Sequence, residues 1–345
     1  MCEKKRATKA VFEPKNFDPM GNRSQIQLFQ EKKYAVSSQT DLLEEVEDNR
    51  PVLHISFSGG RTSGVMTEIL IKKYNKTHRI IVTFANTGRE LEETLQFVHD
   101  CDVHKGFNTV WLEGVFNPEK GKGTRHKIVS FETATRGSAI FTKMIEKYGI
   151  PNKSFRHCTR ELKINVMNSY LRSLGLKRSM VQTAIGIRAD EPTRSKNLMY
   201  DENYCFPLLD ANEAPMSKQE VIEWWSKQSF DLQLEEHDGN CALCFEKSDE
   251  KVIRQIIERP DSINFILEME AKHAQTNNKP NYPNRVFFRG NASGKDMLEA
   301  ARLEKLEKGS GIKFLKESRK TNKVVRDDQA LLAKKLEHDA LSEVA

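Results

Sequence analysis

The fold of this chain is most constrained by one short stretch, which reads Ser56-Phe57-Ser58-Gly59-Gly60-Arg61-Thr62-Ser63-Gly64. The stretch follows an apolar run and precedes a helical pattern. Two adjacent glycines allow a sharp turn, and without a Cβ they let main-chain N–H groups approach an anion. The start of a helix adds unpaired N–H groups and the positive end of its dipole. We predict a phosphate-binding loop whose binding residues are Ser56, Ser58, Gly59, Gly60, Arg61, Thr62 and Ser63.

The alternative is a glycine turn that only joins a strand to a helix. The rest of the pattern favours a binding loop, because strand-length and helix-length segments alternate from residue 52 onward. Strands are predicted over 52–57, 79–84, 108–112 and 181–187, and helices over 62–74, 90–101, 134–148 and 160–174. This alternation indicates an α/β fold, Rossmann-like, with a mainly parallel sheet and helices on both faces. Ligands bind such sheets where the strand order reverses.

Changes in polarity and in hydrophobic pattern along the chain divide it into four segments. Residues 1–50 are a polar N-terminal extension with a short helical pattern near 41–46, and residues 51–230 form the α/β domain. Residues 231–300 hold a Cys-x-x-Cys turn and helices, and residues 301–345 form a charged helical tail. Ser217 and Glu220 have the spacing of a capping box at the start of a helix.

Composition favours a cytoplasmic protein without a membrane partner. No apolar run reaches about 18 residues, and the N-terminus lacks the apolar core of a signal peptide. The net charge of +6 suits an anionic ligand, although an ordinary soluble surface explains it equally well, and it leaves nucleic acid as a partner undecided.

The loop Ser58-Gly59-Gly60-Arg61-Thr62-Ser63 resembles the Ser-Gly-Gly-x-Asp-Ser loop of the phosphoadenylyl-sulfate (PAPS) reductase family, within the PP-loop or adenine nucleotide alpha-hydrolase group. Three later segments, 84–95, 151–163 and 186–194, are similar to family elements in the same order. The resemblance implies that residues 51–230 are an adenine-nucleotide-binding domain. Its small-molecule partner would be ATP, APS or PAPS.

The resemblance also assigns further residues to the site. It implies nucleotide-binding roles for Asn86, Thr87, Gly88, Gly186, Arg188 and Arg194, and contacts to a second phosphate or sulfate for Arg156, Arg160 and Lys163. For any single arginine, a surface role is the alternative. Glu92 and Glu93 are better explained as a solvated first helical turn, where acids suit the dipole.

Cys241 and Cys244 form a Cys-x-x-Cys pair, a spacing that suits two thiolates on one metal centre or a dithiol redox pair. Cys158 precedes a predicted helix start, which we expect to lower its pKa, and we assign catalytic roles to Cys158, Cys241 and Cys244. Cys158 and Cys205, or His157, would supply the remaining ligands. The resemblance implies a [4Fe–4S] cluster, with structural zinc as second choice and buried thiols without metal as the alternative. Cys2 and Cys101 are expected to take no part.

The chain departs from the family pattern at two places. Thr62 occupies the position of the loop aspartate, and no cysteine follows Cys244, whereas thioredoxin-dependent reductases carry a late Glu-Cys-Gly element. We expect sulfur or adenylyl chemistry, either reduction of phosphoadenylyl sulfate or sulfur transfer to a nucleic acid. A sulfur-donor or thiol reductant protein would be the partner. The alternatives are a non-catalytic subunit that binds nucleotide or carries an iron–sulfur cluster, and an interaction protein that docks through its tail.

Overall fold

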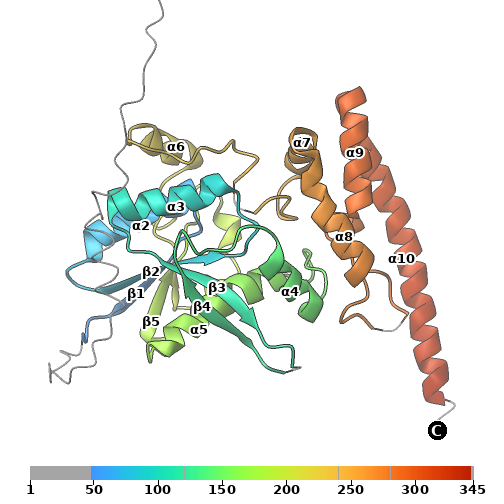
Figure 1. Cartoon of the computed structure of the whole chain (residues 1–345), viewed down its shortest axis with the longest axis horizontal. Coiled ribbons are helices and arrows are strands. Elements are labelled where there is room, and N and C mark those ends of the chain that lie inside the picture. The colour runs from blue at the N-terminus through green and yellow to red at the C-terminus, as the bar shows by residue number, and fades with distance from the viewer. Residues whose placement is uncertain (1–47, 120, 240, 280, 343–345) are drawn as a thin grey trace, which may run out of the picture. The chain divides into compact units, whose positions relative to one another are not determined.

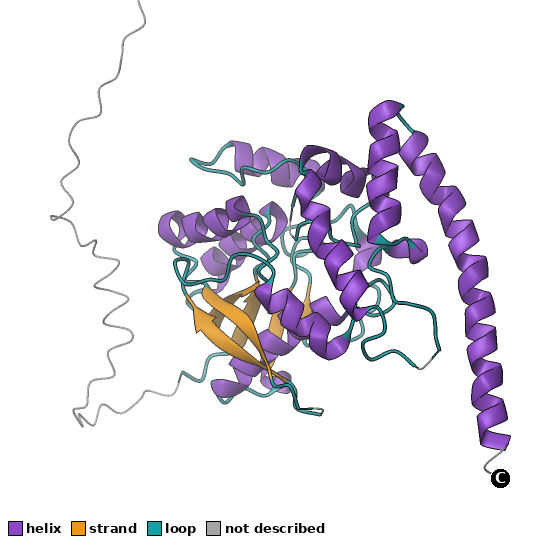
Figure 2. Ribbon diagram, turned by 45° about the vertical axis from the view of Figure 1, so that its right-hand side comes forward, coloured by secondary structure: helices purple, strands orange, loops and turns teal. Residues whose placement is uncertain are grey.

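A computed structural model describes residues 48–119, 121–239, 241–279 and 281–342, with only the backbone from 336 onward (Figures 1 and 2). The chain divides into two units, Met1–Asp48 and Asn49–Ala345. All helices and strands given below belong to the second unit. The helix expected near 41–46 and Cys2 lie outside the described residues.

A six-stranded sheet in the order β4-β3-β2-β1-β5-β6 forms the centre of the fold. The strands are β1 (Val52–Ser56), β2 (Arg79–Asn86), β3 (Val110–Phe116), β4 (Thr124–Val129), β5 (Val181–Ala184) and β6 (Tyr204–Cys205). All neighbours are parallel except β3 and β4, so the predicted mainly parallel sheet is confirmed. In register, Ser56 of β1 lies beside Thr83 of β2, and Ile55 lies beside Ala184 of β5.

The sequence pattern did not reveal β4 or β6. β4 reads Thr-Arg-His-Lys-Ile-Val and lies at the edge of the sheet, where exposed charges protect the unpaired outer edge of a strand from aggregation. Those charges hide the apolar alternation that predicts a strand. β6 has two residues, too few for any periodicity.

Helices cover both faces of the sheet, as predicted (Figure 1). On one face lie α2 (Arg61–Tyr74), α3 (Glu92–Lys105) and α6 (Lys218–Ser226), which share one hydrophobic cluster with β1 and β2. On the other lies α5 (Asn165–Ser173), which packs against β4, while α4 (Ala139–Tyr148) contacts β3. The capping box at the start of α6 is confirmed, since Ser217 and Glu220 each bind the other's backbone N–H.

A second hydrophobic cluster joins α4 to the C-terminal helices α7 (Asp249–Glu258), α8 (Asn264–His273), α9 (Gly294–Leu306) and α10 (Ser310–Ser342). It contains Ile140 and Leu162 beside Ile253 and Leu315. The predicted segments 51–230, 231–300 and 301–345 therefore share one core, and their boundaries stay predictions. Among the described helices, none has the length and apolarity needed to cross a membrane.

Candidate functional site

The loop after β1 lies where the strand order of the sheet reverses. The chain moves from β1 to β2 on one side, and β5 later joins β1 on the other. In open α/β sheets, the crevice at such a switch point is where ligands bind. The loop is therefore positioned where the fold offers a binding crevice.

Ser63 fixes the shape of this loop from inside. Its Oγ accepts from Ser58 N at 3.1 Å, lies 2.9 Å from Ser58 Oγ and donates to Gly60 O at 3.0 Å. Gly59 has φ +74°, and a Cβ there would come within 2.7 Å of Thr94 Cγ2. Only glycine suits that backbone and that space.

The start of α2 carries no capping group. No side chain accepts from its first turn, and that turn holds no acidic residue. Because the first N–H groups of a helix lack intrahelical partners, this end offers donors and positive potential to an anion. Thr62 is only half-buried, so its hydroxyl is within reach of such a ligand.

Arg61 does not take the predicted phosphate-binding role. Its Nε pairs with Asp231 Oδ1 at 2.7 Å, and its other nitrogens donate to the carbonyls of Leu232 and Leu234. In addition, Trp225 Nε1 donates to Arg61 O at 2.8 Å. Arg61 therefore ties the loop to the segment after α6, because those acceptors satisfy its guanidinium.

The loop after β5 packs directly against the loop after β1. A Cβ on Gly186 would lie 3.2 Å from Ser63 Cα, so the two backbones are in close contact. Arg188 Nη1 donates to Thr62 Oγ1 at 3.4 Å, while its Nε pairs with Asp190 at 2.9 Å. The structure thus brings Arg188 to the loop. Arg194 is exposed and pairs with Glu191, so it is not directed at the loop.

The turn after β2 uses its polar groups internally. Asn86 is fully buried, its Nδ2 donates to Glu113 Oε1 and Thr135 O, and its Oδ1 accepts from Gly88 N. Thr87 donates to the carboxylate of Glu90 from both N and Oγ1. The side chains of Asn86 and Thr87 therefore shape the edge of the sheet rather than face a ligand, and Gly88 takes part through its backbone N–H.

Three cysteines gather beside this turn. Cys241 Sγ donates to Glu90 Oε1 at 3.3 Å and lies 3.6 Å from Thr87 Oγ1, while Ala242 N donates to Arg89 O. Cys158, Cys241 and Cys244 all interact electrostatically with the ammonium of Lys163. We call Cys158, Cys241, Cys244 and Lys163 the cysteine group.

Burial dominates the acidity of the Cys158 and Cys241 thiols. It raises the pKa of Cys158 to about 11, although a lowered value was expected at a helix start. The pKa of Cys241 rises to about 12 through burial and the charge of Glu90, against the effect of Lys163. The pKa of Lys163 itself is raised, first by Cys241 and also by Glu90, so its ammonium stays protonated. The prediction for Cys158 was wrong because desolvation outweighs the helix end.

Cys158 begins a π-helical segment, Cys158–Ile164, that leads directly into α5. Such segments are rare and occur frequently at functional sites. His157 stacks on Tyr148 and Phe155, and burial lowers its pKa to about 4. Arg156 pairs with Glu246 and Arg160 with Glu161, both on the exposed side of this segment.

The structure does not bring Cys205 to the cysteine group. Cys205 lies on β6 at the far edge of the sheet, and its pKa is raised to about 12 by burial and by Glu213 and Asp210. Cys101 is buried in the first hydrophobic cluster, as expected of a residue outside the site. The predicted set of four ligands is therefore reduced to three.

Among the described residues, His237, Asp238 and Glu258 are the only three candidate ligands whose atoms all lie within 4.8 Å of one another. The three sulfurs of the cysteine group are thus spaced more widely than the ligands of one zinc ion. Asp238 and Glu258 are already paired with Arg259 and Arg254. His237 Nε2 donates to Glu258 Oε2 at 2.6 Å and lies 3.7 Å from Asp238 Oδ2, so these three residues already bind one another or neighbouring arginines.

The turn that carries Cys241 and Cys244 is held by a buried glutamine. Gln255 Oε1 accepts from Leu243 N at 3.0 Å, and Gln255 Nε2 donates to Asp238 Oδ1 at 2.9 Å. Leu243 has φ +50° and is fully buried, so the turn keeps a strained backbone between the two cysteines.

Sequence reasoning missed Glu90, Gln255 and Lys247 as parts of this site. Lys247 donates to Asp238 O and Cys241 O, and burial lowers its pKa to about 8. Glu90 lies two residues after the Asn-Thr-Gly turn, a position that could have marked it. Gln255 lies within an ordinary amphipathic helix and gave no signal.

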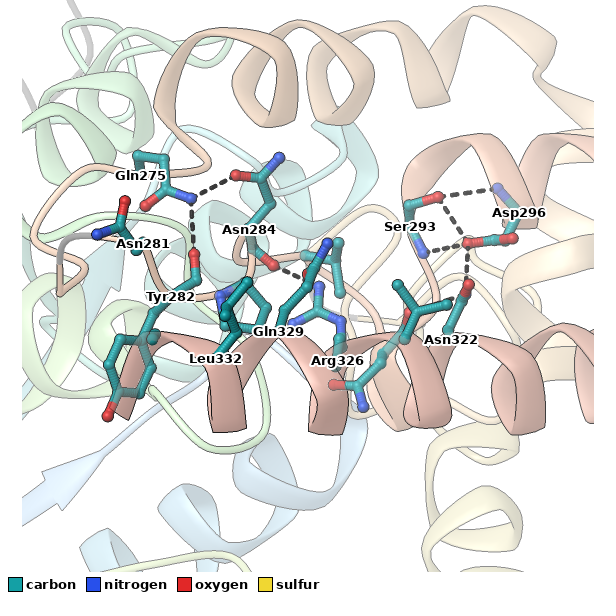
Figure 3. A pocket seen from close by; sticks show the side chains of 15 residues that line it. Gln275, Asn281, Tyr282, Asn284, Ser293, Asp296, Asn322, Arg326, Gln329 and Leu332 are labelled. Carbon is teal, nitrogen blue, oxygen red and sulfur yellow. Dashed lines mark hydrogen bonds between the residues drawn. The ribbon is translucent and has the colours of Figure 1, made fainter. Parts of the chain in front are cut away.

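A cavity of about 550 Å³ lies elsewhere, between α10 and the segment from Gln275 to Asp296 (Figure 3). Its amides largely bind one another, since Gln275 Nε2 donates to Asn284 Oδ1 and Tyr282 O. Arg326 donates to Asn284 O. No cysteine and no residue of the loop after β1 lines it, so we assign it no part in the site.

The fold and the loop at the switch point define an α/β protein of the doubly wound class. No family model matches the chain. Over 201 residues, 57% of this chain and 67% of the relative, it is 32% identical to the uncharacterized nin region protein ORF290 of Escherichia phage lambda. The chain therefore belongs to the same family as ORF290.

Two proteins of Methanocaldococcus jannaschii are more distant relatives. The uncharacterized protein MJ0973 is 25% identical over 205 residues, and the chain covers 42% of its length. The uncharacterized protein MJ0066 is 28% identical over 122 residues, and the chain covers 20% of its length.

Proposed function

We propose that this protein binds an adenine nucleotide, ATP, APS or PAPS, with the loop after β1 and performs sulfur or adenylyl chemistry beside it. The observation that carries the proposal is the contact between Gly186 and Ser63 at the switch point. It sets the uncapped start of α2 beside Arg188, and backbone N–H groups together with a guanidinium suit phosphate or sulfate.

The cysteine group supports the chemical half of the proposal. Its thiols lie beside the turn after β2, at the same carboxyl edge of the sheet as the loop after β1. Lys163 would offset the negative charge of a thiolate, and Glu90 is the acceptor placed for the Cys241 proton. The likeness of four segments to the PAPS reductase family points to the same chemistry.

An iron–sulfur cluster fits this donor set in part. Cys158, Cys241 and Cys244 would be its ligands, and the protonated Lys163 would balance their charge. Such a cluster, when bound, would supply electron-transfer or sulfur chemistry. Neither Cys101 nor Cys205 is placed to complete the four cysteines that a [4Fe–4S] cluster usually has.

A non-catalytic nucleotide-binding or cluster-carrying subunit is the second candidate. The observation that favours it is Thr62, whose hydroxyl meets Arg188 where the resembling loops have a carboxylate. Without that carboxylate, the loop lacks the acidic ligand that a Mg²⁺ ion on the phosphates would use.

Isothermal titration with ATP, APS and PAPS tests the binding. We expect Ser63→Ala to lower the affinity for the nucleotide about tenfold, because Ser63 holds Ser58 and Gly60 in place. Ser173→Ala, at the exposed end of α5, is the matched control and should change nothing. No binding of any of the three nucleotides at millimolar concentration would overturn the proposal.

Turnover separates the two candidates. Pyrophosphate release from ATP, with and without nucleic acid, and anaerobic reduction of PAPS are the two readouts. Either activity supports the enzyme. Nucleotide binding without either one supports the non-catalytic subunit.

A further inference from the structure

The second half of α10 exposes apolar side chains to solvent. Val324, Val325, Leu331 and Leu332 are 48–61% exposed, and all four lie within residues 324–332. Single exposed apolar residues are normal on a protein surface and need no explanation. Four of them on so short a piece of one helix form a local concentration, and such concentrations are typical of surfaces that bind another protein.

One side of α10 attaches it to the rest of the chain. Leu315 and Ala333 are fully buried, and Arg319 pairs with Asp249 of α7 at 2.6 Å. With a turn of about 100° per residue, Leu315, Arg319 and Ala333 all lie on this one side of the helix. We call it the packing side.

The exposed apolar residues lie away from the packing side. Val324 and Leu331 lie within about 20° of each other around the helix and roughly 160–180° from Ala333. Val325 and Leu332 lie about 100° around the helix from that pair, between it and the packing side. They border the cavity beside α10 (Figure 3). The exposed surface is therefore a broad arc with two apolar margins.

Two opposite charges occupy the middle of this arc. Lys335 lies about 40° and Asp328 about 60° around the helix from Leu331, so both fall between the two apolar margins. Both are exposed, and neither forms an ion pair with another side chain of the described residues. They are seven residues apart, about 10 Å along the helix, too far to pair with each other. We call the following residues the α10 surface: Val324, Val325, Asp328, Leu331, Leu332 and Lys335.

The α10 surface is complementary to a second copy of itself that runs in the opposite direction. A two-fold axis midway between Asp328 and Lys335 sets each Asp328 opposite the Lys335 of the other copy. The same axis brings the two Leu331 side chains together on one margin and the two Leu332 side chains together on the other. A parallel pair would instead set Asp328 against Asp328 and Lys335 against Lys335, and like charges opposite each other are unfavourable.

The position of α10 leaves this surface accessible. The main contacts of α10 are with α7, α9 and the short helix Arg289–Asn291. In both overall views the C-terminal half of α10 extends beyond α8 and α9 (Figures 1 and 2). Among the described elements, none therefore prevents a second helix from lying along the α10 surface.

We propose that the α10 surface is a dimer interface, in which two copies of this chain pair their α10 helices antiparallel. The charge pattern selects a second copy as the occupant, because Asp328 and Lys335 complement each other only across a two-fold axis. One helix pair buries less area than a standard interface, so we expect a reversible dimer with a dissociation constant of micromolar order. This inference does not depend on nucleotide binding.

Sedimentation equilibrium of the full chain, from low to high micromolar concentration, tests this. The parent protein should change from monomer to dimer over this range. Lys335→Asp sets an aspartate against the Asp328 of the other copy, twice in each dimer, and should raise the dissociation constant at least about tenfold. Lys316→Asp makes the same charge change at an exposed residue in the first half of α10 and should leave the dissociation constant unchanged.

A charge exchange tests the direction of the helices. The single variant Asp328→Lys should weaken the dimer as Lys335→Asp does, whereas the double variant Asp328→Lys, Lys335→Asp restores opposite charges across the two-fold axis. The double variant should therefore dimerise like the parent protein. In a parallel pair, the parent and all three variants would set like charges against each other, so no such loss and recovery would occur.

The apolar contact at the axis is tested separately. Leu331→Ala shortens the side chain in both copies and should raise the dissociation constant roughly tenfold, while alanine keeps the helix stable. Leu306→Ala, at the exposed end of α9, makes the same change away from the α10 surface and serves as the control.

Three results would overturn the proposal. The first is a parent protein that stays monomeric over the whole concentration range. The second is a dimer that Asp328→Lys and Leu331→Ala leave as stable as the parent dimer, because its interface would then lie elsewhere. The third is a double variant that dimerises no better than the single variants. Loss of the dimer in the single variants with recovery in the double variant supports the antiparallel pair.

Discussion

Gly186 and Ser63 touch through their backbones at the point where β5 and α2 meet, since a Cβ on Gly186 would lie 3.2 Å from Ser63 Cα and 3.3 Å from Ser63 N. Gly186→Ala would push the first turn of α2 by a few tenths of an ångström. Because the proposed anion site consists of that turn, we expect the nucleotide dissociation constant to rise about tenfold in calorimetric titration.

The control for this change is Gly123→Ala, where a Cβ meets nothing within 4 Å. That variant should bind as the parent does. If Gly186→Ala binds nucleotide as tightly as the parent protein, the place where α2 meets the loop after β5 is not the nucleotide site.

Each cysteine of the cysteine group should be needed for iron. In anaerobically purified protein, we expect Cys158→Ser, Cys241→Ser and Cys244→Ser to lose iron and the visible absorption band, because each would remove one ligand. Cys205→Ser should keep both, since β6 lies at the far edge of the sheet. If the parent protein contains neither iron nor zinc, the prediction of an iron–sulfur cluster is wrong. If it contains zinc without iron, the site is a structural zinc site instead.

His54 should make the fold sensitive to acid. It bridges Thr183 and Thr83 across β1, and burial lowers its pKa from 6.5 to about 4. Between these two pH values the unfolded chain binds more protons than the folded one, so stability is complete above pH 6.5 and is lost as the pH falls. The loss should reach about 3 kcal/mol near pH 4.

Denaturant unfolding at pH 6.5, 5.5 and 4.5 measures this effect. His54→Gln should be less stable at neutral pH but have a flatter pH profile, because the glutamine does not titrate. Parallel profiles for the parent and the variant would show that the proton is taken up elsewhere, for instance at His157, whose pKa is also lowered to about 4.

Gln255 should be essential for the Cys-x-x-Cys turn. Gln255→Leu would remove the acceptor of Leu243 N and one donor to Asp238 Oδ1. Each buried polar group left unsatisfied costs about 1–3 kcal/mol of stability. We expect a lower free energy of unfolding and faster alkylation of Cys241 and Cys244. The same change at the exposed Gln233 should have neither effect.

Much of the fold could be predicted because it depends on local periodicity. The parallel strands of the sheet core, the helices between them and the capping box at Ser217 are all patterns within a short window. β4 escaped because Arg125, His126 and Lys127 interrupt its apolar alternation.

The site was predictable in its loops but not in its side-chain partners. The glycines of the loop after β1 predicted a turn, and the spacing of Cys241 and Cys244 predicted a pair of neighbouring thiols. The engagement of Arg61 by Asp231, and the separation of Cys205 from the other cysteines, depend on contacts between distant parts of the chain. No local pattern encodes such contacts.

The direction in which the Cys158 side chain points depends on the number of residues in the π-helical segment Cys158–Ile164. Asn165 N donates to Arg160 O, five residues back, so this turn contains one residue more than an α-helix would accommodate. Deleting a single residue from it would restore the ordinary register and rotate everything before it by about 100° relative to α5. Cys158 would then point away from Cys241 and Cys244 with its own side chain untouched. An insertion of one residue into an ancestral helix is therefore enough to create, or to abolish, the meeting of these three cysteines.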